Sequence, residues 1–202
     1  VKSTCLATTH PKIAKQWHST KNGDLTPFDV KAMSNRKVWW KCDKGDDHEW
    51  ITTVDKRSIG RKCPVCSGKK VVKSNCLATI CPEITREWHS TKNGDLTPFD
   101  FTVLSHKKVW WQCDKSDDHE WEALISSRSK GYGCNVCTGK KAVKSNCLAT
   151  THPELAKEWH LKKNGELTPD LFSSKSGKKV WWLCSKGHEW KTNIYSRTIG
   201  TG

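Results

Sequence analysis

Cysteine and histidine residues at fixed intervals are the side chains of this sequence best suited to chemistry. Cys42 and His48 are separated by five residues, and after fourteen further residues come Cys63 and Cys66. Zinc in structural sites takes four thiolate or imidazole donors, and a Cys-x-x-Cys turn places both sulfurs on one side of the ion. The spacing therefore predicts a closed structural zinc site that supports a core too small to be stable alone.

These donors recur further along the chain. The second set, with the same spacing, is Cys113, His119, Cys134 and Cys137. The third set holds only Cys184 and His188, with three residues between them instead of five. Because the whole set repeats, buried free cysteines without metal are the weaker alternative. We expect about two zinc ions per chain at complete sites, and an incomplete third site whose hairpin frays if its Cys-x-x-Cys pair is absent.

The donors belong to a repeat with a period of 71 residues, which also relates Trp17, Trp88 and Trp159. A fixed period predicts an array of similar small units before any local propensity is considered. We expect three zinc modules, at residues 1–71, 72–142 and 143–202, the last truncated before its Cys-x-x-Cys pair. The sequence is therefore expected to be part of a longer chain, whose other domains would be its neighbours.

Each module is expected to be a small α+β unit, with a short helix and a β-hairpin. Pro11 is a favoured first helical residue and Trp17 lies on the face of Ile13, which predicts a helix over about 11–19. The segment 26–29 is typical of a capped helix start or a turn. The β-rich runs 37–42 and 49–54 flank Cys42 and His48, which predicts a hairpin with two metal ligands at its tip.

Tryptophan supplies most of the large apolar surface, with twelve residues against four Phe and two Tyr. We expect most of these side chains in the module cores. Trp39 and Trp40 must point to opposite faces of a strand, as must their counterparts in the other modules. One of each pair is then a candidate platform for stacking an unpaired base or a partner's side chain.

A second group of possible ligands also repeats. It consists of Cys5, His10 and His18, then Cys76, Cys81 and His89, then Cys147, His152 and His160. Three donors are one short of a closed site, and the middle residue precedes a proline in each copy. We interpret this group as local structure at the entry to a helix, with a second metal as the alternative.

The formal net charge of +14 favours a polyanionic partner, with nucleic acid first and DNA ahead of RNA. The alternative is a lysine-rich surface that only increases solubility. The arginine after the second strand would bridge either to a phosphate or to a carboxylate of its own module. The candidate nucleic-acid contacts are Arg36, Lys37, Arg57, Lys69, Lys70, Lys107, Lys108, Arg128, Lys140, Lys141, Lys178, Lys179 and Arg197.

Other classes of protein are disfavoured. The sequence has no glycine-rich phosphate loop, no Gly-x-Ser-x-Gly and no recurring carboxylate pair beside a nucleophile, so we expect no enzyme within it. The eleven cysteines are an odd number, which cannot all pair within the chain, and two Cys-x-x-Cys pairs occur among them. This favours metal over disulfides, and hence a reducing intracellular compartment, whether cytoplasm, nucleus or organelle interior. The sequence contains no run of about 18 apolar residues, so no membrane-spanning helix is predicted.

Several distinctive motifs carry a resemblance over the whole chain. They are Lys-Lys-Val-Trp-Trp-x-Cys and Gly-His-Glu-Trp in residues 152–190, and Cys-Pro-x-Cys at 63–66. With these, the sequence resembles a family of tandem zinc-ribbon or treble-clef repeats, sometimes fused to nuclease domains. The resemblance implies zinc at Cys42, His48, Cys63 and Cys66 and at their counterparts, with nucleic-acid binding as the usual expectation. Asp47 and Asp118 depart from it, since glycine is usual before the ligand histidine.

The first functional hypothesis is a zinc-stapled array that binds nucleic acid, chiefly through lysine and arginine contacts to phosphates and with possible tryptophan stacking. The alternative is a protein-interaction or assembly module. A third is the DNA-targeting part of a nuclease whose catalytic domain lies outside this sequence.

Overall fold

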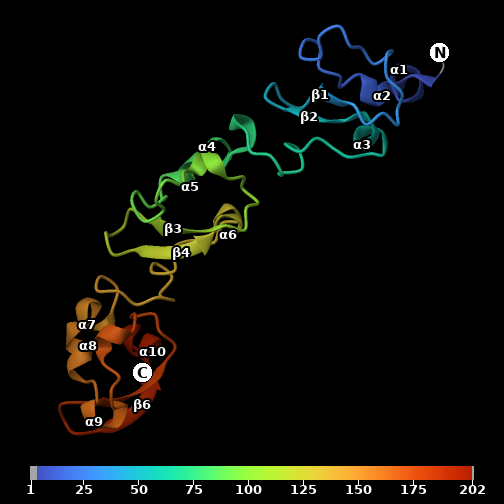
Figure 1. Cartoon of the computed structure of the whole chain (residues 1–202). Coiled ribbons are helices and arrows are strands. Elements are labelled where there is room, and N and C mark those ends of the chain that lie inside the picture. The colour runs from blue at the N-terminus through green and yellow to red at the C-terminus, as the bar shows by residue number, and fades with distance from the viewer. Residues whose placement is uncertain (1–3, 202) are drawn as a thin grey trace. The chain divides into compact units, whose positions relative to one another are not determined.

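The computed structural model describes residues 4–201, and we call residues 1–71, 72–142 and 143–202 modules 1, 2 and 3. By compactness the chain divides into two units, Val1–Pro82 with Leu96–Leu104 and Glu83–Asp95 with Ser105–Gly202. Figure 1 labels the elements along the chain. Module 1 contains α1 (Leu6–Thr9), α2 (Pro11–Ala14), β1 (Lys37–Lys41), β2 (Glu49–Thr53) and α3 (Val54–Ser58). Module 2 contains η2 (Lys73–Asn75), α4 (Leu77–Ile80), α5 (Pro82–Thr85), η3 (Pro98–Asp100), β3 (Lys108–Gln112), β4 (Glu120–Leu124) and α6 (Ile125–Ser129). Module 3 contains α7 (Leu148–Thr151), α8 (Pro153–Lys157), α9 (Leu161–Asn164), η4 (Pro169–Leu171), β5 (Lys179–Leu183), β6 (Glu189–Asn193) and α10 (Ile194–Thr198).

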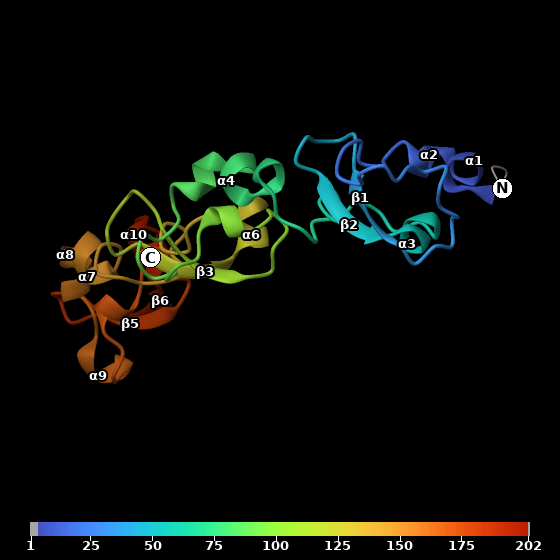
Figure 2. The same ribbon diagram turned by 45° about the horizontal axis from the view of Figure 1, so that its top comes forward.

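Each module is built on an antiparallel hairpin, so the expected fold of small α+β modules is confirmed. In module 1, β1 pairs with β2 in the register Trp40 opposite Trp50, and β3–β4 and β5–β6 repeat this register. In β1 the buried residues Val38 and Trp40 alternate with the more exposed Lys37, Trp39 and Lys41, which suits a pleated surface with one buried face. A helix follows the second strand directly, as Figure 2 shows for α3 after β2.

A bridge to β1 takes the place of the second half of the expected helix. The helix over 11–19 was predicted too long, because α2 ends at Ala14. Gln16 O then accepts from Lys41 N at 2.8 Å, and His18 N donates to Trp39 O at 3.1 Å. These two bonds form an isolated antiparallel bridge between Trp17 and Trp40, so pairing with β1 overrides the local helical pattern.

Tryptophan rings form the centre of each module, as expected. Trp40 is fully buried and meets Trp17 edge to face, with ring centroids 5.5 Å apart at 76°. The core of module 1 is completed by small aliphatic residues, Leu6, Val30, Val38 and Val54 among them. Burying one tryptophan removes about 200 Å² from water, or about 5 kcal/mol of transfer free energy before conformational entropy is counted.

Among residues 4–201, no helix combines the length and the apolar character needed to cross a membrane.

Candidate metal centre

The hairpin and the segment after α3 bring the four predicted ligands of module 1 together. Cys42 directly follows β1 and His48 directly precedes β2, and Cys42 N donates to His48 O at 3.0 Å. Cys63 and Cys66 come from a tight turn, in which Ser67 N donates to Cys63 O and Gly68 N to Val65 O. Gly68 has φ 69, a conformation that residues with a Cβ seldom adopt. One donor atom from each of the four residues lies within 4.8 Å of all the others.

The spacing of these donor atoms fits a zinc tetrahedron. With Zn–S near 2.3 Å and Zn–N near 2.0 Å, ideal edges are about 3.8 Å between sulfurs and about 3.6 Å between sulfur and nitrogen. The distance between Cys42 Sγ and Cys66 Sγ is 3.6 Å, and His48 Nδ1 lies 3.3 Å from Cys66 Sγ and 4.0 Å from Cys63 Sγ. Three thiolates and Nδ1 of the imidazole form the closed Cys₃His donor set of structural zinc sites, and no open coordination position remains for a substrate.

Module 2 repeats the arrangement with Cys113, His119, Cys134 and Cys137. Cys113 Sγ lies 3.7 Å from Cys137 Sγ, and His119 Nδ1 lies 3.3 Å from both sulfurs. The ring's other nitrogen, Nε2, lies 3.1 Å from Ser145 Oγ. A hydrogen bond at this second nitrogen fixes the tautomer and orientation of a ligating imidazole.

Loss of solvation favours the protonated form of three of the ligand thiols when no cation is present. It raises the pKa of Cys66 and of Cys113 to about 12. The pKa of Cys137 is raised for the same reason. A divalent cation reverses this preference, because the thiolate is the form that binds metal. The two centres therefore suit a cation that displaces protons from sulfur, as zinc does.

Module 3 keeps only half of the donor set within the described residues. Cys184 N donates to His188 O at 3.1 Å, so the loop at the hairpin tip still closes. His188 is nevertheless exposed, whereas His48 and His119 are buried. Trp190 of β6 is also less covered than its counterparts Trp50 and Trp121. The hairpin forms, and the side that a Cys-x-x-Cys turn covers in the other modules is open.

The arginine after the second strand lies inside its module, a placement that sequence reasoning left open. Arg57 is buried between Trp40 and Trp50, with Cζ 5.5 and 5.6 Å from the ring centroids. Its Nη1 donates to Arg61 O and its Nη2 to Gln16 Oε1. The counterparts Arg128 and Arg197 donate instead to Glu87 and Glu158. The structure thus places these three guanidinium groups on partners within their own modules.

A histidine, a glutamate and a lysine form a further repeated cluster that the sequence reasoning missed. His18 Nε2 lies 2.9 Å from Glu49 Oε1, and its Nδ1 accepts from Lys21 N at 3.2 Å. Lys21 Nζ bonds the second oxygen of Glu49 and lies 4.9 Å from the centroid of the Trp39 ring. The hydrogen bonds from Lys21 and His18 lower the pKa of Glu49 to about 2. Modules 2 and 3 repeat the cluster, and the shared 71-residue period was the available signal.

The residues Cys5, His10 and His18 do not converge. Cys5 Sγ lies 3.2 Å from Thr8 Oγ1, His10 Nδ1 lies 2.9 Å from Thr9 Oγ1, and His18 belongs to the cluster with Glu49. Among the described residues, the donor groups close enough to hold a metal ion are the two Cys₃His sets. The interpretation of Cys5 and His10 as local structure at helix starts agrees with these contacts.

In modules 1 and 2, the loop that carries the ligand histidine also forms hydrogen bonds to the start of the following module. Asp47 accepts from Ser74 N at 2.8 Å and from Ser74 Oγ at 2.7 Å. Asp118 makes the same two bonds to Ser145. Asn75 adds bonds from its Nδ2 to Val65 O and Lys70 O. We call the pairing of this aspartate with this serine the Asp–Ser joint. In module 3 the equivalent of the aspartate is Gly187.

Basic side chains other than these arginines lie on the surface. All ten of the remaining candidates are exposed, namely Arg36, Lys37, Lys69, Lys70, Lys107, Lys108, Lys140, Lys141, Lys178 and Lys179. Lys70 and Lys141 also donate to backbone carbonyls at the start of the second strand. Their ammonium groups therefore lie beside the hairpin.

Comparison with known proteins agrees with this geometry. A search of curated proteins finds no match for the chain. The model of one family, described as "Probable Treble clef zinc finger domain", matches residues 13–69, 84–140 and 155–202. Its first two matches run through the Cys-x-x-Cys turns of modules 1 and 2, and the third covers the half-site of module 3. Because these matches cover most of the chain, the protein belongs to this treble-clef zinc finger family, in three tandem copies.

Proposed function

We propose that this tandem array binds nucleic acid through lysine and arginine contacts to phosphates, on modules whose shape is held by structural zinc. The observation that carries the proposal is the exposure of all ten candidate basic residues outside the cores, in a chain with net charge +14. Such a surface is attracted to any polyphosphate backbone and needs no particular base sequence.

One half-buried tryptophan at the same position of each module supports a contribution from stacking. Trp39, Trp110 and Trp181 occupy the same strand position in the three modules, on the face opposite the fully buried tryptophan. Lysine ammonium groups lie 4.5 to 4.9 Å from their ring centroids. A partly exposed ring beside a cation offers a base and its phosphate adjacent contacts.

Binding of a labelled duplex, and of one of its strands alone, to the zinc-loaded chain at several salt concentrations tests this function. We expect the logarithm of the affinity to fall linearly with the logarithm of salt, with a slope of about −0.9 per phosphate contact on duplex DNA. Replacing Lys69 and Lys140 by Gln should reduce the slope by one to two. Lys157→Gln is the control, because this lysine is paired with Glu154 of its own helix. Absence of binding at low salt would refute the proposal.

Exposed apolar residues favour a second candidate, self-association of the array. Phe28 and Met33 are 63% and 74% exposed in module 1, and Phe99 and Leu104 are 61% and 66% exposed at the equivalent positions of module 2. Isolated apolar side chains are common on surfaces, so the repetition of the pair is the informative feature. Sedimentation over a range of concentrations tests it. A monomer at all concentrations would exclude this candidate.

A further inference from the structure

Positive charge is unevenly divided among the three modules, although they share one fold. Residues 1–71 contain 15 Lys and Arg against seven Asp and Glu, a net charge of +8. Residues 72–142 contain ten against nine, or +1, and residues 143–202 contain ten against five, or +5. More than half of the net charge of the chain thus belongs to module 1, and a polyanion would meet very different surfaces on modules 1 and 2.

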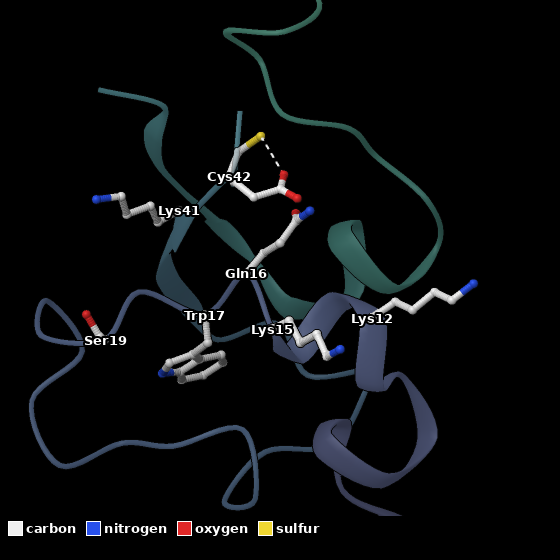
Figure 3. A pocket seen from close by; sticks show the side chains of 8 residues that line it. Lys12, Lys15, Gln16, Trp17, Ser19, Lys41 and Cys42 are labelled. Carbon is white, nitrogen blue, oxygen red and sulfur yellow. Dashed lines mark hydrogen bonds between the residues drawn. The ribbon is translucent and has the colours of Figure 1, made fainter. Parts of the chain in front are cut away.

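Part of the charge of module 1 surrounds a hollow beside the zinc centre. This helix-side hollow has a volume of about 400 Å³, and Figure 3 shows Lys12 and Lys15 extending from the helical segment and Lys41 from the strand. The carboxylate of Asp43 also lines it, and Lys41 Nζ lies 3.6 Å from Asp46 Oδ1, so three cations are set against two carboxylates. The ring of Trp17 lies in the same wall. An aromatic wall among lysines suits a nucleotide unit, with a base or sugar on the ring and phosphates on the ammonium groups.

The same hollow in module 2 has a similar volume, about 440 Å³, but the opposite charge. Glu83 replaces Lys12 and Gln112 replaces Lys41, and Asp114 and Asp117 also line the space. Only Arg86 keeps the positive charge of its counterpart, Lys15. The two hollows therefore differ in electrostatics rather than in size, and the one in module 2 repels a phosphate.

A second hollow lies over the strand side of module 1, against the Cys-x-x-Cys turn. This strand-side hollow has a volume of about 720 Å³ and includes the cations Arg61, Lys62 and Lys69. Its counterpart in module 2 is about 350 Å³, with Tyr132 and Gly133 in place of Arg61 and Lys62. Glu122 of module 2 also replaces Ile51, which lines the hollow of module 1. Both charge and space for an anion are thus reduced in module 2.

The buried arginine adds to this contrast. Arg57 lines the strand-side hollow, and its Nη2 donates to Gln16, which lines the helix-side hollow. In module 2 the equivalent bond, Arg128 to Glu87, is an ion pair. Module 1 therefore keeps a guanidinium charge between its two hollows without a carboxylate bonded to it. A charge held at low dielectric acts over a longer range than a solvated one.

We infer that module 1 is the principal phosphate-binding module of this chain, through its helix-side and strand-side hollows, and that module 2 contributes little to binding. The inference rests on the proposed nucleic-acid function and assigns that function to particular residues. The ligand is the phosphodiester backbone, whether of a duplex or of a single strand.

Two variants with the same net charge test the inference. The first carries K12E, K41Q, R61Y and K62G, which puts the residues of module 2 at the equivalent positions of module 1 and lowers the charge by five. The control carries K130Q, K144Q, K157Q, K162Q and K186Q, which removes five charges from modules 2 and 3 at exposed lysines that are not among the ten candidate contacts. Each substituted residue of the first variant occurs in the same fold one copy later, and the zinc content of both proteins verifies that their centres are intact.

We expect the first variant to lose at least thirtyfold in affinity for the duplex at about 100 mM salt and to lower the salt slope by roughly three. The control should lose less than fivefold. Equal losses in the two variants, or a larger loss in the control, would overturn the inference while leaving the proposed function intact. Absence of binding by the unmodified chain would refute the proposed function itself. Titrating the duplex and the single strand in parallel shows which form of the backbone the hollows prefer.

Discussion

Replacing Gln16 by Glu should stabilise module 1, because it would give Arg57 the carboxylate that the equivalent arginines of modules 2 and 3 already have. Arg57 is 7% exposed, and burial lowers its pKa, which means that desolvation works against its charged form. A hydrogen bond from a charged donor to a charged acceptor contributes about 1 kcal/mol more than one to a neutral amide. The equivalent Glu87 is 32% exposed, so part of the gain is screened by solvent, and we expect a net stabilisation of up to about 1 kcal/mol.

Hydrogen exchange of the full zinc-loaded chain can assign this change to one module. A gain of about 1 kcal/mol corresponds to roughly fivefold slower exchange of amides that open only when the module unfolds. We expect this slowing in peptides that cover β1 and β2, with peptides of β3 and β4 unchanged as an internal reference. The reciprocal E87Q, which leaves Arg128 with a neutral partner, should accelerate exchange in β3 and β4 by a similar factor.

A matched control separates the ion pair from the change in net charge. K12Q lowers the net charge of module 1 by one, as Q16E does, without placing a carboxylate beside Arg57. It should leave exchange of β1 and β2 within about twofold of the unmodified chain. The reasoning is refuted if Q16E does not slow exchange in module 1, or if K12Q slows it equally.

Three further outcomes follow from the metal centres and from the contact between modules 2 and 3. C63S should reduce bound zinc from about two ions per chain to about one by elemental analysis, whereas C184S should leave it at two, because its site lacks the second pair of donors. Zinc uptake at pH 7 should release about three protons per site, measurable by calorimetry in buffers of different ionisation enthalpy. Because burial raises the pKa of Cys66 to about 12, protons compete with zinc for this sulfur, and zinc affinity should fall as the pH is lowered. Proton release near zero would contradict the thiolate assignment. G139A should destabilise the chain by about 2 kcal/mol in thermal unfolding, because this residue has φ 77 and an added Cβ would lie 2.6 Å from a neighbouring side-chain carbon, whereas G177A, where nothing lies within 4 Å, should have little effect.

The hairpins and the two donor sets could be predicted because they depend on local pattern and spacing. Val38 and Trp40 alternate with more exposed residues before Cys42, and a second β-rich run follows His48. This pattern specifies a hairpin with ligands at its tip, whatever surrounds it. A Cys-x-x-Cys turn has few geometries, so the approach of Cys63 and Cys66 to that tip also follows from sequence. The third module shows the same rule, since the half-set around Cys184 leaves its histidine exposed.

Features that depend on contacts between distant segments could not be predicted in this way. The helix begun at Pro11 ends early because residues 16–18 gain more from pairing with β1 than from continuing the helix. The role of Asn22 is similar, since its side chain bonds both Trp39 N and Trp39 O across seventeen positions of sequence. Whether Arg57 faces solvent or its own core is decided by two tryptophans on paired strands, and a linear pattern of residue types does not contain that pairing.

The Asp–Ser joint divides its two halves between neighbouring copies, and this has a consequence for how such a protein can change in length. Asp47 and Asp118 lie late in one copy and their serine partners lie early in the next. Duplicating a copy that carries the aspartate would therefore create a new aspartate and a new serine already in the right order, and the new joint would be complete without a compensating mutation. The copy that has Gly187 at this position supplies the serine that binds the aspartate of the preceding copy. It has no aspartate with which to bind the serine of a following copy. Recombination that duplicates internal, aspartate-bearing copies can thus lengthen the array with every new joint intact. After a copy with glycine at this position, the next copy must be held by contacts other than the Asp–Ser joint.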